Sequence, residues 1–130
     1  MSKGMNKNTS IYTASLMQEL GPKMDWNPKK NKQLINAILE IKNVDEAQRF
    51  LRDLMTPTEI TEFANRLEAA SLLSSDMQYN YITEKTGLSS ATIARIAKWL
   101  GGSLGGYRLI LNRINHHNSS PLGKGLSLRS

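Results

Sequence analysis

The sequence contains no cysteine, which excludes a disulfide framework and a thiolate metal site. Its two histidines are adjacent, at His116 and His117, and without a third ligand nearby they are weak evidence for a metal site. It also lacks a cysteine nucleophile and a glycine loop with the lysine and spacing of a P-loop. We therefore expect that the protein is not an enzyme and carries no cofactor.

Long apolar runs are missing too. No stretch approaches the roughly 20 apolar residues that a membrane span needs, and the polar start of the chain does not have the apolar core of a signal peptide. The absence of cysteine suits a reducing compartment. We expect a cytoplasmic protein with no membrane partner.

Acidic residues are absent after Glu84. The seven basic residues beyond it contribute +7 to a total of +6, so residues 1–84 sum to −1. A surface of one sign attracts polyanions. We interpret the basic residues between Lys85 and Arg113 as a nucleic-acid footprint, whereas Lys124 and Arg129 fit a solubilising tail.

Helix-start signals recur through the first half of the chain. Asn27 is expected to cap a helix with Pro28 at its first position, Asn43 precedes Glu46 by three residues, and Thr56-Pro57-Thr58-Glu59 has the pattern of a capping box. With no repeats and no strand-rich section, these signals predict an all-α fold.

The chain divides by composition into three parts. Residues 1–26 read as a flexible arm with a weak helical pattern over 11–20, residues 27–114 as a helical domain, and residues 115–130 as a disordered basic tail with little apolar surface. Segment 107–114 fits either a strand or a short helix, and the all-α context favours the helix.

Residues 79–98 have the pattern of a helix-turn-helix. Two short helices flank a turn at Thr86-Gly87-Leu88, where glycine adopts positive φ at little cost. Asp76 is expected to cap the first helix and Ser89 the second. The apolar positions expected to be buried are Ile82, Leu88, Ile93 and Ile96. The alternative is a plain helical hairpin, and Thr83 and Thr86 depart from the usual small and apolar residues at their positions.

In a helix-turn-helix the second helix enters the major groove, so its first turn should be small or polar. Arg95 is the best candidate for a bidentate guanine or phosphate contact, and two residues that open the first helix suit a phosphate contact. The predicted DNA-binding residues are Tyr79, Asn80, Ser89, Ser90, Ala91, Thr92, Ala94, Arg95 and Lys98.

Residues 54–100 resemble the Trp-repressor superfamily. The resemblance is carried by Leu54-Met-Thr-Pro-Thr-Glu59, Arg66-Leu67, Leu72-Leu73 and Thr86-Gly-Leu-Ser-Ser-Ala-Thr-Ile-Ala-Arg95. Arg95-Ile-Ala-Lys-Trp-Leu100 and Gly105-Gly-Tyr-Arg-Leu-Ile-Leu111 are closer still to its YerC/YecD branch. The resemblance implies an intertwined helical homodimer that binds double-stranded DNA at a palindromic operator through helix 89–100, as a transcriptional regulator and most simply a repressor.

The resemblance also implies an effector pocket. Thr56, Arg66, Thr92 and Arg95 match the family's ligand-contacting positions, but Ile96 stands in place of a glycine and Trp99 in place of a serine. We hypothesise that one of these bulky residues fills the cavity, so that tryptophan is not needed as a co-repressor. Thr56 would then be a helix cap only, and Arg66 would serve packing or pair with Glu62. Binding of another small effector stays open.

The alternative function is that of an accessory module. Helix-turn-helix domains also occur in accessory modules of replication or transposition, which bind DNA or protein without an operator of their own. Such a module would lose DNA affinity steeply and uniformly with salt, whereas a repressor keeps a sequence preference near physiological salt.

Overall fold

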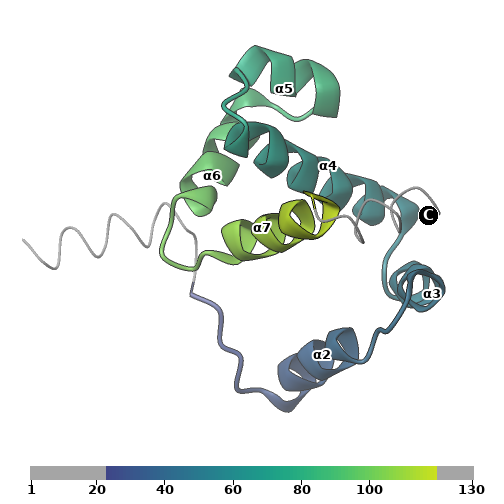
Figure 1. The fold of residues 1–130 in the computed structure, drawn as a ribbon. Coiled ribbons are helices and arrows are strands. Elements are labelled where there is room, and N and C mark those ends of the chain that lie inside the picture. The colour runs from purple at the N-terminus through teal and green to yellow at the C-terminus, as the bar shows by residue number, and fades with distance from the viewer. Residues whose placement is uncertain (1–22, 120–130) are drawn as a thin grey trace, which may run out of the picture. The chain divides into compact units, whose positions relative to one another are not determined.

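The computed structural model describes residues 23–119, and over this range the chain forms helices joined by turns, with no strand (Figure 1). The helices are α2 (Lys29–Leu39), α3 (Val44–Leu54), α4 (Pro57–Ser74), α5 (Tyr79–Thr86), α6 (Ser90–Leu100) and α7 (Gly106–Ser119). The all-α prediction is confirmed. The chain divides into two compact units, one ending at Phe63 and one starting at Ala64. The predicted arm up to residue 22, its weak helix and residues 120–130 lie outside the described residues.

Two helix starts in the first unit are fixed by side-chain caps, as predicted. The Asn43 carboxamide oxygen accepts from the backbone N–H of Glu46 at 2.9 Å. At α4, the Glu59 N–H donates to the Thr56 hydroxyl at 3.1 Å and the Thr56 N–H donates to the Glu59 carboxylate at 2.9 Å. These reciprocal bonds are a capping box, which satisfies two helix-end donors within four residues.

The start of α2 differs from the prediction. The helix begins at Lys29, and Pro28 is its N-cap with an extended ψ of 141° and no side-chain cap. The Pro28 carbonyl accepts from the Asn31 and Lys32 N–H groups. Asn27 does not cap the helix, because the cap position belongs to Pro28 and Asn27 lies one residue before it. The Asn27 N–H donates to the Asp25 carboxylate at 2.9 Å.

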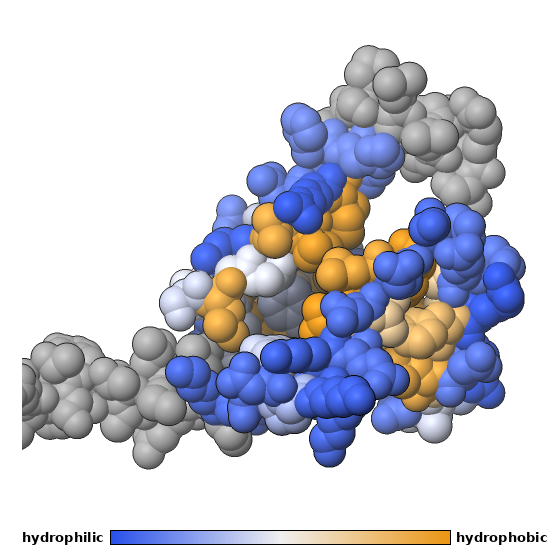
Figure 2. Space-filling view, turned by 90° about the horizontal axis from the view of Figure 1, so that it is seen from below, coloured by the Kyte–Doolittle hydropathy of each residue, from blue (hydrophilic) through white to orange (hydrophobic). Residues whose placement is uncertain are grey.

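Apolar side chains of the first unit remain at the surface. Neither α2 nor α3 contains a buried residue. Between residues 29 and 63, the large apolar residues that are 39% to 74% exposed are Leu34, Ile35, Ile38, Leu39, Val44, Leu54 and Phe63. We call these seven residues the open apolar set. On the face seen in Figure 2, apolar residues lie exposed among hydrophilic ones. Exposed apolar patches of this kind mark interaction surfaces.

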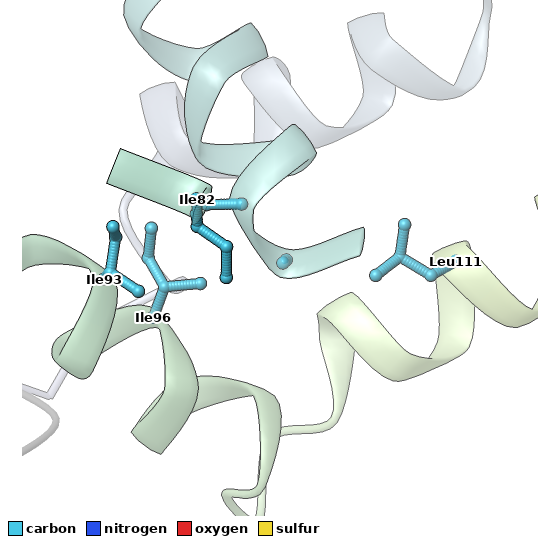
Figure 3. Packing of buried hydrophobic residues seen from close by; sticks show 6 residues of the cluster. Ile82, Ile93, Ile96 and Leu111 are labelled. Atoms are coloured by element: carbon cyan, nitrogen blue, oxygen red, sulfur yellow. The ribbon is translucent and has the colours of Figure 1, made fainter. Parts of the chain in front are cut away.

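The second unit has a small closed core. Its buried apolar residues are Ala69, Ala70, Ile82, Ile93, Ile96 and Leu111. Ile82 of α5 lies beside Ile93 and Ile96 of α6 (Figure 3), and Leu111 joins this cluster from α7. Helix α5 packs against α6, and α6 packs against α7. The core therefore holds the helix-turn-helix on the end of α4.

Asp76 does not cap α5, contrary to the prediction. It adopts a left-handed φ of 61°, and its N–H bonds to the Leu73 carbonyl while the Met77 N–H bonds to that of Leu72. These are the bonds of a Schellman ending. Asp76 is thus used to end α4, and α5 starts later, after Gln78 as an N-cap without a side-chain bond.

Segment 107–114 is helical, as preferred over a strand, but its helix α7 continues to Ser119. The predicted tail therefore starts too early, because residues 115–119 belong to the helix. Extending an existing helix adds one hydrogen bond for each residue fixed, so polar residues can continue it.

Candidate nucleic-acid interface

The turn between α5 and α6 is built from glycine and threonine. Gly87 takes the predicted positive φ, 73°, and its N–H bonds to the Thr83 carbonyl at 2.8 Å. The buried Thr86 hydroxyl donates to the Ile82 carbonyl at 2.7 Å and accepts from the Leu88 N–H at 3.2 Å. A threonine at this usually apolar position is therefore accommodated, since both functions of its hydroxyl are used inside the turn.

Ser89 caps α6 as predicted, so the helix proper begins at Ser90 instead of Ser89. Its hydroxyl accepts from the Thr92 N–H at 3.1 Å and lies 3.0 Å from the Thr92 hydroxyl. The cap satisfies one of the free N–H groups at the helix start, and this end carries the positive side of the helix dipole. A phosphate approaching α6 would meet that end first.

The predicted contact residues of α6 lie on the side away from the core. Ile93 and Ile96 are at most 1% exposed. Ser90, Ala91, Arg95 and Lys98 are exposed, and Thr92 and Ala94 are partly exposed. One face of α6 thus anchors the helix, and the other presents small, hydroxyl and cationic side chains.

The first helix of the motif offers a second group of exposed residues. Tyr79 and Asn80 open α5 and are exposed, as the phosphate-contact prediction requires. Tyr81 was not among the predicted contacts. The Lys85 ammonium lies 5.5 Å from the centre of its ring, within the range of a cation–π contact. The i, i+4 spacing of the two residues on one helix was the sequence signal for this pair.

The residues of the predicted effector pocket are spread over both units. Thr56 belongs to the first unit, where its hydroxyl works in the capping box. Arg66, Thr92, Arg95 and Trp99 belong to the second unit. Arg66 lies near Tyr107 of α7, whose pKa is raised by burial and lowered in part by the Arg66 charge. Tyr107 was missed because nothing local in the sequence places it opposite α4.

Ile96, which the resemblance predicts to stand at the family's glycine position, lies within the core cluster with Ala69, Ala70 and Ile82. Trp99 is partly exposed. The two bulky replacements therefore differ in surroundings, and Ile96 is the one whose side chain is enclosed by protein.

His116 and His117 share the last turns of α7 and line a shallow hollow with Asn112 and Arg113. Within residues 23–119 no group of three or more potential metal-ligating side chains comes together. In the same range, no helix is both long and apolar enough to cross a membrane.

Comparisons with known proteins agree with this architecture. A family model described as Trp repressor protein matches residues 29–115. The chain is 37% identical over 92 residues to the uncharacterized protein YerC of Bacillus subtilis (strain 168), covering 71% of this chain and 88% of YerC.

Two crystal structures are also similar. One is a TrpR-like protein from Eubacterium eligens ATCC 27750, with 37% identity, a TM-score of 0.65, and coverage of 69% of this chain and 93% of that one. The other is a provisionally assigned Trp repressor from Staphylococcus aureus, with 31% identity, a TM-score of 0.66, and coverage of 72% and 96%.

The match therefore includes α2 to α7 nearly complete, with the glycine turn and capped second helix inside it. The aligned region covers between 88% and 96% of each of these relatives, so the similarity extends over whole domains. The chain belongs to the Trp repressor family of helix-turn-helix DNA-binding transcription regulators, in its YerC-like branch.

Proposed function

We propose that the protein is a sequence-specific transcriptional repressor that binds a palindromic operator as a homodimer in the cytoplasm, and that it is not an enzyme. The observation that carries this proposal is the division of α6 into two faces. Ile93 and Ile96 are buried, whereas Ser90, Ala91 and Arg95 face solvent. A rigid helix with a small first turn can enter the major groove closely, and Arg95 can reach a base edge one turn further on.

The charge distribution supports a nucleic-acid partner. No acidic residue follows Glu84 in the sequence, so α6 and α7 carry only positive formal charge. Neutralising phosphates with these cations releases counterions and supplies affinity independent of sequence. The residues of α6 would then supply the sequence preference.

The homodimer is supported by the open apolar set. Helices α2 and α3 bury no residue in the single chain, although α3 is amphipathic and both helices carry large apolar side chains. A second copy of the chain is the one partner that is always available in equal amount to cover these side chains. With two copies of α6, the half-sites should be centred about one DNA turn apart, roughly 34–36 Å.

We also propose that tryptophan is not required. Ile96 is buried in the core, and a buried isoleucine at the family's glycine position occupies volume that a ligand would need. Isothermal titration should detect no micromolar tryptophan binding to the wild type. Tryptophan binding in that range would contradict this part of the proposal.

The test of DNA recognition begins with selection of bound fragments from random DNA, followed by gel-shift titration of the selected site at several salt concentrations. Arg95→Ala should lower affinity for that site by about 1–3 kcal/mol. Arg113→Ala, which removes the same charge from α7, is the matched control. It should weaken binding to the operator and binding to random DNA to the same small extent.

The outcome separates the two functions. A preference for one sequence that persists near physiological salt supports a repressor. Uniform, steep loss of affinity for all sequences would instead favour an accessory module without its own operator.

A further inference from the structure

The loop after α6 contains three glycines among its five residues, Gly101 to Gly105. Gly101 caps α6, and Gly105 has a φ of 70° immediately before α7. Glycine gives a chain more conformational freedom than any other residue. A helix that ends in such a loop would have a poorly fixed direction unless another contact holds its end.

Arg108 supplies a contact of this kind. Its guanidinium Nη1 donates to the carbonyl oxygen of Leu100, the last residue of α6, and to that of Gly102 at 2.8 Å. The last carbonyls of a helix have no partner within the helix. A side chain from α7 therefore closes the end of α6 across the loop.

Gly105 leaves the space that this guanidinium occupies. A Cβ on Gly105 would lie 3.0 Å from Nη2 and 3.6 Å from Cζ of Arg108. The neighbouring Gly106 shows the contrast, because a Cβ there would meet nothing within 4 Å. Loop conformation and arginine position are thus matched to each other.

The positive charge of Arg108 is unfavourable at the start of its own helix and favourable at the end of α6. Arg108 stands in the first turn of α7, where the helix dipole disfavours a cation. At the C-terminal end of α6 the dipole has the opposite sign, and the cation is favourable there. The unfavourable placement on one helix is offset by capping the other.

We infer that Arg108 is a positioning residue for DNA recognition: it fixes the end of α6 against α7 and does not itself contact DNA. This inference rests on the proposed function. It removes Arg108 from the nucleic-acid footprint, although its charge was counted there from sequence. Both carbonyls are reached from Nη1, which lies one bond further along its side chain than a lysine ammonium does. A lysine at the same position therefore keeps the charge but falls short of the two carbonyls.

The test compares Arg108→Lys and Arg108→Gln with the control Arg113→Gln, which removes a cation from the same helix. Both Arg108 variants should bind the selected operator about three- to tenfold more weakly, from the loss of charge-assisted hydrogen bonds. The salt dependence of Arg108→Lys should equal that of the wild type. Wild-type operator affinity for Arg108→Lys would show that only the charge matters and would overturn the inference.

A measurement without DNA separates this inference from the proposed function. The N–H groups of Gly101 and Gly102 bond to the carbonyls of Ala97 and Trp99. Their amide hydrogen exchange should accelerate in Arg108→Lys and in Gly105→Ala, and stay unchanged in Arg113→Gln and Gly106→Ala. Unchanged exchange in both of the first two variants would refute the clamp, even if the wild type bound its operator. If exchange accelerated in these two variants but the wild type showed no preference for any DNA sequence, the clamp would be supported and the repressor function contradicted.

Discussion

Replacing Thr86 by valine tests whether the turn of the helix-turn-helix depends on one hydroxyl. Among the described residues, Thr86 is the one buried polar side chain, at 6% exposed. Valine keeps the shape and the β-branch but removes both hydrogen bonds. The Ile82 carbonyl lies four residues before Thr86 in α5 and retains its helical partner. The Leu88 N–H loses the acceptor that it has at 3.2 Å.

The expected magnitude follows from these two effects. Leaving a partly buried N–H without an acceptor costs about 1–3 kcal/mol. Burying a methyl group in place of a hydroxyl returns about 0.8 kcal/mol. The net loss should be about 1 kcal/mol, which corresponds to a fall in Tm of about 4–8 °C for a domain of this size.

Thr83→Val is the matched control on the same helix. The Thr83 hydroxyl donates to the Tyr79 carbonyl at 2.9 Å in an exposed setting, so this change should alter stability by less than about 0.5 kcal/mol. Urea unfolding followed by circular dichroism, at one fixed protein concentration, measures both variants. If Thr86→Val proved as stable as Thr83→Val, the hydroxyl would not support the turn and the reasoning would fail.

Three further predictions concern the caps and the turn. Hydrogen bonds from the Thr56 backbone and hydroxyl lower the pKa of the Glu59 carboxyl from its ordinary value. The capping box therefore stabilises the fold above the unfolded-state pKa, and this stabilisation is lost as pH falls through the folded-state pKa, so Glu59→Gln should flatten the loss of helicity at acid pH in a circular dichroism titration. Ser89→Ala should destabilise by about 1 kcal/mol in urea unfolding, and Ser89→Gly by only a few tenths. Gly87→Ala meets no atom within 4 Å, so its cost should be conformational, about 1–2 kcal/mol, and smaller for Gly87→Asn; equal costs would indicate a steric cause.

Local signals predicted most of what the structure contains. The caps at Asn43, Thr56 and Ser89 each depend on residues three apart, so sequence spacing is sufficient to find them. The inner and outer faces of α6 follow from the 3.6-residue period around Ile93 and Ile96 in the same way.

Predictions failed where one residue had two local uses. Asp76 suits both a cap before α5 and a left-handed position after α4, and the structure uses the second. Asn27 does not take its expected cap role because the helix starts one residue later than predicted, with Pro28 as its N-cap.

Contacts across loops lay beyond sequence reasoning. The pairing of Arg108 with the end of α6 depends on the path of a glycine-rich loop, and the proximity of Arg66 to Tyr107 depends on the packing of α7. No periodicity or motif encodes either one.

The open apolar set has a genetic consequence. If these residues pair two copies as proposed, a chain with intact α2 and α3 but a defective α6 would still join wild-type chains. Expressed in equal amounts, random pairing would leave only about a quarter of the dimers with two working recognition helices. Alleles altered at Arg95 should therefore behave as dominant, whereas alleles that place charges within the open apolar set should be recessive.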